Sequence, residues 1–132
     1  MSSFLRFIRY WLPAVFWMGV IFYFSSKSRV TVSDQETVNF IVFKTLHMIE
    51  YAMLYFLLFR GFYSIKNKKL SLPERFLYPF ILAMFYAATD EFHQTFSSHR
   101  EGTPRDVIID TIGITVMYIY IKKNLSFVKK FI

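Results

Sequence analysis

The segment TDEFHQTF, residues 89–96, places two carboxylates, an imidazole and an amide at the end of a long apolar run. Asp90 and Gln94 are one helical turn apart and share a face, and Glu91 lies beside them. A carboxylate pair of this kind can act as general acid and base, bind a cation or accept hydrogen bonds from a ligand. Ionisable groups at a membrane boundary are costly unless other groups pair with them, so the remaining sequence has to supply partners.

A second polar set lies in the segment KTLHMIEY, residues 44–51. Lys44, His47 and Tyr51 follow the spacing i, i+3, i+7 and therefore share one face of a helix. Glu50 is adjacent to that face, three residues from His47. The histidine is a candidate general base or metal ligand, and the alternative is a hydrogen-bonded histidine at a helix contact.

The third polar set begins in the loop SSHREGTPRD, where a glycine and a proline predict a tight turn. Asp106 and Asp110 follow one turn apart at the start of the next apolar segment. A helix N-terminus favours the negative charge of Asp106. Arg100 and Arg105 can neutralise these carboxylates or hold an anionic ligand group such as a phosphate.

Four apolar segments have to position these polar sets, and they lie at about 10–24, 44–63, 76–96 and 107–121. A helix that crosses the hydrocarbon core needs ~20 residues, so the shorter segments depend on flanking interfacial residues such as Trp11 and Lys122. Helices are expected because a backbone in lipid must satisfy its own hydrogen bonds, and the segments are too long for barrel strands. The sequence therefore predicts an all-α, integral membrane four-helix bundle in one domain, residues 1–132.

The first segment has a second interpretation, as a cleaved signal sequence. Basic residues precede it and the small residues SSKS follow it. The polar stretch FSSKS fits better as part of the outer surface of the mature protein, so four spans are the preferred prediction.

Composition supports lipid as the solvent. The chain is 55% hydrophobic and 21% aromatic but only 19% charged, which is more apolar surface than a small soluble domain can bury. The 132 residues contain no cysteine, which excludes disulfides, thiol catalysis and cysteine-ligated metals.

The net charge of +7 is unevenly distributed along the chain. Eleven of the 16 lysines and arginines lie in residues 1–10, 60–75 and 122–132. The positive-inside rule therefore places both termini in the cytoplasm and accounts for the basic charge without nucleic acid. The cluster KNKK, residues 66–69, is expected to lie against anionic headgroups. Eight of the nine acidic residues then lie outside or in the outer half of the spans.

This orientation brings the three polar sets to one depth. The third segment runs outward, and Asp90 lies about 21 Å along the helix from Phe76. The second and fourth segments enter from the outside with their polar residues first. The predicted functional cluster, near the outer surface, is Lys44, His47, Glu50, Tyr51, Asp90, Glu91, Gln94, Arg100, Asp106 and Asp110.

Together these residues resemble the pattern of the VanZ-like family of small bacterial membrane proteins, and the resemblance runs through the whole chain. The pattern has a serine pair after the first helix, Lys-x-x-His-x-x-x-Tyr, Asp-Glu-x-x-Gln, and then an Arg, an Asp and a Gly. Its counterparts here are Ser25 and Ser26; Lys44, His47 and Tyr51; Asp90, Glu91 and Gln94; and Arg100, Asp106 and Gly113. The family commonly has Asn where this chain has Asp110, which adds a possible negative charge.

The family is named for a protein that lowers susceptibility to the glycopeptide teicoplanin. The resemblance implies a multi-pass protein of the bacterial cytoplasmic membrane with a cell-envelope role at the outer face. Its expected partners are membrane lipids and either a lipid-linked cell-wall component or a glycopeptide. The resemblance supplies no chemical mechanism.

Several interpretations of the cluster stay open. It is a binding site, a hydrolase or transferase site for a phosphorylated lipid-linked substrate with Glu91 as acid or base, or interhelical polar contacts without further function. His47, Glu50, Asp90 and Glu91 are suitable metal-ligand types, but no zinc spacing such as H-E-x-x-H occurs. No cofactor is expected. A transporter is disfavoured because there are no inverted repeats.

His93 points away from the face that carries Asp90 and is expected at the membrane interface, whereas His99 is expected to be solvated. Gly19 and Gly113 are candidates for close helix approach, although no GxxxG motif supports dimerisation. The sequence leaves the oligomeric state open.

Overall fold

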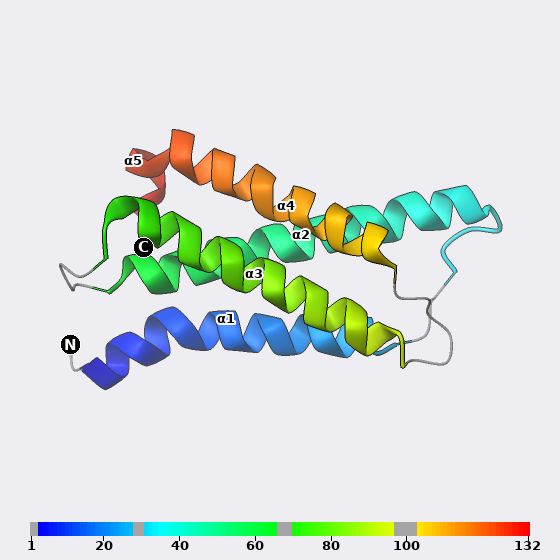
Figure 1. Cartoon of the computed structure of the whole chain (residues 1–132), viewed down its shortest axis with the longest axis horizontal. Helices are drawn as coiled ribbons and strands as arrows, with labels where there is room; N and C mark the ends of the chain where they lie inside the picture. The colour runs from blue at the N-terminus through cyan, green and yellow to red at the C-terminus, as the bar shows by residue number, and fades with distance from the viewer. Residues whose placement is uncertain (1–2, 28–30, 66–69, 97–102) are drawn as a thin grey trace.

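The computed structural model describes residues 3–27, 31–65, 70–96 and 103–132. Within these ranges the chain is helical, with turns and short connections and no strand. Four long helices and one short helix follow each other along the chain (Figure 1). Their bounds are α1 Ser3–Ser25, α2 Glu36–Tyr63, α3 Leu72–Gln94, α4 Pro104–Lys123 and α5 Leu125–Val128. The prediction of an all-α chain is confirmed.

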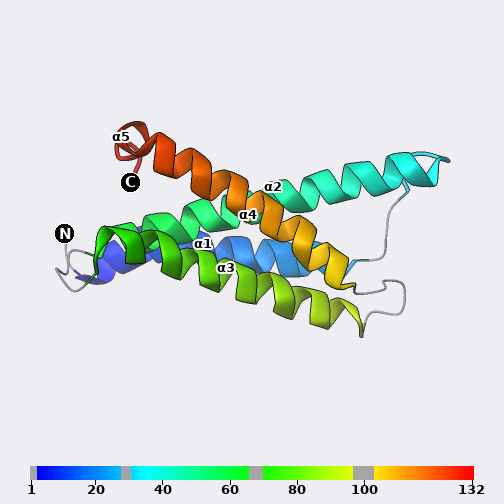
Figure 2. The ribbon, with the colours of Figure 1, turned by 45° about the horizontal axis from the view of Figure 1, so that its top comes forward.

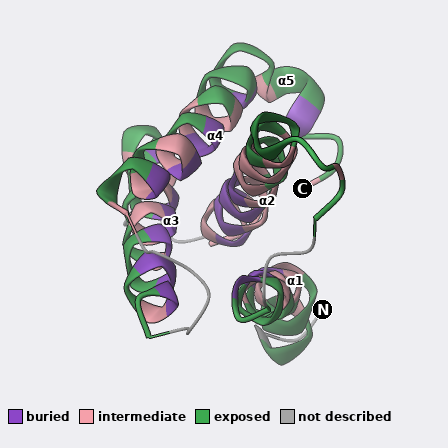
Figure 3. Cartoon of the chain, turned by 90° about the vertical axis from the view of Figure 1, so that its right-hand side faces the viewer, coloured by how far each residue is buried: buried purple, intermediate pink, exposed green. Residues whose placement is uncertain are grey.

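The helix α2 is the centre of the arrangement. It packs on α1, α3 and α4, and its most extensive partner is α4. The buried parts of these helices face one another, whereas α1 is exposed over most of its surface (Figure 3). The first turns of α2 extend beyond the other helices in both views of the ribbon (Figures 1 and 2). The start of α1 lies at the same end of the molecule as α5 (Figure 1).

A capping box fixes the start of α3. The Ser71 backbone N–H and hydroxyl donate to Glu74 Oε2 over 2.6 and 2.7 Å, and Pro73 occupies the first turn, where no N–H is needed. Hydrogen bonds from Ser71 also lower the pKa of the Glu74 carboxyl group. The carboxylate of Glu74 is therefore committed to this helix end.

An aromatic core joins α2, α3 and α4 at the end where the termini lie. We use this name for Tyr55, Phe59, Phe76, Phe80 and Tyr118. The rings of Phe59 and Phe76 are 4.8 Å apart, and those of Phe76 and Tyr118 are 5.8 Å apart, between centroids. Tyr55 contacts Phe80 and Tyr118 edge-on at 6.2 Å, an arrangement that aromatic rings favour.

The backbones of α2 and α4 come closest at Gly113. A Cβ atom added there would overlap the Met48 carbonyl oxygen and lie 2.9 Å from its carbonyl carbon. Only glycine allows this crossing, as the sequence predicted. The same expectation for Gly19 is wrong within this chain, because a Cβ atom there would have nothing within 4 Å. Gly19 lies on an exposed face of α1.

Two helices, α1 and α2, are long and apolar enough to cross a membrane. Only 11% and 22% of their most apolar windows are buried, whereas the core helix of a soluble protein is mostly buried. Among the described residues α3 and α4 do not meet the same criterion. Large apolar side chains are nevertheless exposed on all four long helices, for example Phe16, Ile49, Phe85 and Val116.

Candidate functional site

The site begins at Asp90, near the end of α3. Asp90 is 4% exposed, and its Oδ2 accepts hydrogen bonds from the Tyr51 hydroxyl at 3.3 Å and from Gln94 Nε2 at 3.2 Å. Gln94 Nε2 also contacts Ser25 Oγ at 2.8 Å. These bonds join the end of α1, the middle of α2 and the end of α3 through buried polar atoms.

The start of α4 brings the second half of the site. Asp106 pairs with Lys44 of α2, with Nζ and Oδ1 2.5 Å apart. The Thr103 backbone N–H, which precedes α4, donates to Glu91 Oε1 over 2.5 Å. Lys44 and Thr103 thus connect the acidic residues of α3 and α4 to neighbouring elements.

Asp110 lies among these groups. It is 4% exposed, and the charged groups that influence it are Glu91, Lys44, Asp90 and Asp106. No hydrogen bond or ion pair to Asp110 occurs within the described ranges. We use the name polar cluster for Ser25, Lys44, Tyr51, Asp90, Glu91, Gln94, Asp106 and Asp110.

His47 and Glu50 form a separate pair along α2. His47 Nδ1 lies 3.5 Å from Glu50 Oε2, and both side chains are partly exposed. The indole N–H of Trp17 donates to the Glu50 backbone oxygen over 2.9 Å. This stretch of α2 therefore contacts α1, whereas Lys44 and Tyr51 contact α4 and α3.

The polar cluster contains more carboxyl groups than cations among the described residues. Four buried carboxylates, Asp90, Glu91, Asp106 and Asp110, adjoin one partly buried cation, Lys44. Arg105 Nε is 3.9 Å from Asp106, but its side chain is 65% exposed. Such a site favours a positively charged group, because the local dielectric is lower than that of water.

Arg100, which the sequence places over the carboxylates, and His99 lie outside the described residues. Over the described part of the chain, no group of three or more histidines and acids is arranged to hold a metal ion. The metal interpretation therefore gains no geometric support from those residues.

The polar cluster lies at the end of the molecule opposite to the termini (Figure 1). It comprises the last residues of α1 and α3 and the first turns of α4. Lys44 is the ninth residue of α2, and the turns of α2 before it continue past the cluster. All four long helices therefore deliver polar groups to this end of the fold.

The structure adds contacts that residue types alone do not indicate. The Thr103 N–H that binds Glu91 is a backbone donor, so no side-chain signal marks it. Pro104 lies in the first turn of α4 and is the local sequence signal for a helix start at this point. The backbone N–H groups of such a first turn are free to bind other groups. His93 packs its ring against Phe22 of α1, with centroids 4.5 Å apart.

These features define the class of the protein: a small helical protein of membrane type, with apolar side chains exposed along its helices and acidic residues buried at one end. The chain belongs to the VanZ/LLP1 family, whose sequence model matches residues 10–127. The resemblance seen in the sequence motifs is thereby confirmed. Comparisons with curated proteins and with solved structures gave no significant match.

Proposed function

We propose that this chain is a binding protein of the bacterial cell envelope, embedded in the cytoplasmic membrane with its polar cluster at the outer face. All four long helices cross the bilayer, and both termini lie in the cytoplasm. The positive-inside rule supports this orientation, since Arg75, Lys122, Lys123, Lys129 and Lys130 lie at the end opposite to the polar cluster. Exposed apolar residues on α3 and α4, such as Phe85 and Val116, support the two additional spans.

The observation that carries the binding function is the buried carboxylate excess around Asp90 and Asp110. The preferred ligand bears an ammonium group, which the carboxylates bind as charge-assisted hydrogen-bond acceptors. The ligand is a lipid-linked cell-wall component, and its sequestration or protection lowers susceptibility to glycopeptides such as teicoplanin. Binding to the glycopeptide itself would use the same chemistry, and the experiment below separates the two sources.

A purely structural role explains the polar cluster less well. Helices in lipid gain only about 0.6 kcal/mol from an average polar contact, and apolar residues of similar volume often pack as stably as buried ion pairs. Four carboxylates at one level therefore bring a desolvation cost that packing alone does not require. A ligand that supplies positive charge offsets this cost.

The test is a binding titration of the purified protein with an amine-bearing lipid-linked wall precursor, with its N-acetylated form and with teicoplanin. We expect saturable binding of the amine-bearing precursor and a loss of about tenfold or more in affinity on acetylation or in Asp90→Asn, because a charge-assisted hydrogen bond contributes about 1.5–3 kcal/mol. The matched control is Asp34→Asn, which removes an exposed carboxylate outside the polar cluster.

Two results would overturn the proposal. One is equal affinity for the amine and its acetylated form. The other is chemical turnover of the precursor, seen by mass spectrometry and abolished in Glu91→Gln, which would establish the enzyme interpretation instead. If teicoplanin binds and the precursor does not, the drug itself is the ligand of the polar cluster.

A further inference from the structure

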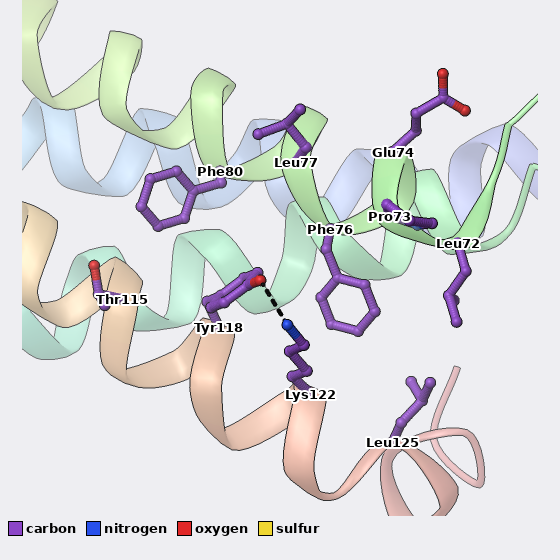
Figure 4. A pocket seen from close by; sticks show the side chains of 10 residues that line it. All are labelled: Leu72, Pro73, Glu74, Phe76, Leu77, Phe80, Thr115, Tyr118, Lys122 and Leu125. Carbon is purple, nitrogen blue, oxygen red and sulfur yellow. Dashed lines mark hydrogen bonds between the residues drawn. The ribbon is translucent and has the colours of Figure 1, made fainter.

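A groove of about 630 Å³ lies between α3 and α4 at the end of the molecule that carries the aromatic core. Residues from the first turns of α3, the second half of α4 and α5 line it, among them Leu72, Phe76, Leu77, Phe80, Tyr118 and Leu125 (Figure 4). Its size falls in the range of small-molecule and cofactor sites, about 300–1,000 Å³. It is separate from the polar cluster, which lies at the opposite end.

The lining of this groove is suited to a hydrocarbon chain. Apolar and aromatic side chains supply most of its surface, and Leu72 and Leu77 at its edge are 50% and 51% exposed. The groove is therefore open along the side of the protein that the proposed membrane position places in lipid. An acyl chain can enter it laterally without crossing water.

Among the described residues that line the groove, Lys122 is the cation. Lys122, in the last turn of α4, extends toward Tyr118, and its Nζ donates to the Tyr118 hydroxyl over 3.3 Å (Figure 4). The ammonium group has two further protons for an anionic partner. Its amine thus stands beside an apolar surface, which is the arrangement an amphiphile with a negative headgroup requires.

The acidic residue of the groove does not cancel this charge. Glu74 accepts hydrogen bonds from Ser71 and Tyr78 and points away from Phe76 and Tyr118 in Figure 4. The same end of the chain adds exposed lysines at 123, 129 and 130. Basic pockets between membrane helices on the cytoplasmic side are known to bind anionic lipid headgroups.

We propose that this groove is a binding site for one anionic phospholipid, with an acyl chain between α3 and α4 and the phosphate at Lys122. Charge complementarity selects this occupant over a neutral lipid. It also selects it over α1 of a second copy of the chain, because α1 is apolar and exposed but contains no acidic residue to pair with Lys122.

The test is native mass spectrometry of the full chain in detergent, titrated with phosphatidylglycerol or with phosphatidylcholine of the same acyl chains. We expect one phosphatidylglycerol per chain, bound at least about fivefold more tightly than phosphatidylcholine. Lys122→Gln should weaken phosphatidylglycerol binding by about tenfold and leave phosphatidylcholine unchanged. The matched control, Lys123→Gln, removes the neighbouring charge outside the groove and should change the affinity by less than twofold.

A second variant tests the acyl-chain contact. Thr115→Trp fills the groove from α4 and should weaken both lipids, with helicity by circular dichroism as the folding control. Lys122→Arg keeps the charge and should retain phosphatidylglycerol binding, which guards against a structural explanation of Lys122→Gln.

The proposal is overturned if the two lipids bind equally or if the Lys122 and Lys123 variants behave alike. It is also overturned if a dimer, dissociated by Thr115→Trp, occupies the groove in place of lipid. Asp90→Asn should leave phosphatidylglycerol binding unchanged. The lipid proposal for the groove and the binding proposal for the polar cluster can therefore fail independently of each other.

Discussion

The same three helices, α2, α3 and α4, pack in two different ways at their two ends. Near the termini they meet through the aromatic core, where Phe59, Phe76 and Tyr118 pack ring against ring. At the other end they meet through carboxylates, a lysine and a tyrosine hydroxyl, as in the contacts of Lys44 with Asp106 and of Tyr51 with Asp90. Gly113 brings α2 and α4 together between these two regions.

This difference in packing indicates that one end of the helices mainly stabilises the fold and the other end mainly serves binding. The aromatic core demonstrates that apolar side chains suffice to pack these helices, so the acids at the other end are not needed for packing as such. Buried charges give weak stabilisation in exchange for a large desolvation cost. We infer that stability resides mainly in the aromatic core and in the glycine crossing, whereas ligand binding resides in the polar cluster.

The largest effect on folding is expected at Gly113, because the close contact of α4 with α2 there supports both the aromatic core and the polar cluster. Gly113→Leu would force α4 away from the Met48 backbone, which no rotamer change can avoid. We expect the variant to lose its folded, monodisperse form in size-exclusion chromatography and to lose binding at both ends. Gly19→Leu is the control, because nothing lies within 4 Å of a Cβ atom there. Equal behaviour of the two variants would contradict the crossing.

Phe59→Ala tests the aromatic core alone. Phe59 is fully buried, and truncation of a buried phenylalanine costs about 3–5 kcal/mol. We expect that loss in the free energy of unfolding, measured by denaturant titration in mixed micelles, with ligand affinity retained by the folded fraction. Phe85→Ala, at a 67% exposed position of α3, should lose less than about 1 kcal/mol. A selective loss of ligand affinity in Phe59→Ala would remove the division between the regions.

Lys44→Met tests whether the polar cluster needs its cation. It leaves Asp106 and three other carboxylates without their nearest buried positive charge. Breaking a buried pair costs about 3–5 kcal/mol, and the partial exposure of this pair lowers the expected cost to roughly 2–3 kcal/mol. Denaturant titration should give this loss for Lys44→Met and none for Lys123→Met. The double variant with Asp106→Leu should recover most of the stability, and failure to recover would argue against the pairing.

The sequence predicted the helices and much of the polar cluster because both depend on local spacing. The i, i+7 relation of Lys44 and Tyr51 puts them on one face of α2, and the structure finds both bonded to carboxylates, one on α4 and one on α3. The spacing of Asp90 and Gln94 likewise brings them to the same bond network. Residue type and helical period carry this information directly.

Contacts that depend on which helix is the neighbour were harder to foresee. His47 and Glu50 lie on the stretch of α2 that contacts Trp17 of α1, because α2 is central and has a neighbour on more than one side. Both glycines lie between apolar residues, yet only Gly113 lies at a crossing, since α1 is peripheral and α4 is not. Spacing within one helix cannot distinguish these cases.

The smallest effect on stability is expected for Asp110→Asn, and its sign is informative. Asp110 is buried beside Asp90, Glu91 and Asp106. Asparagine has nearly the same shape but no charge, so it removes repulsion among the carboxylates without leaving a cavity. We expect the free energy of unfolding to stay constant or rise by up to about 1 kcal/mol, measured by denaturant titration.

Affinity for the amine-bearing ligand should fall in the same variant, because one of four carboxylates is lost. A variant that gains stability but loses affinity would show that Asp110 serves ligand binding and not helix packing. Equal losses of both would make Asp110 a packing residue, and the polar cluster would then stabilise the helices as the aromatic core does. Asp34→Asn provides the reference for removing a carboxylate that is exposed.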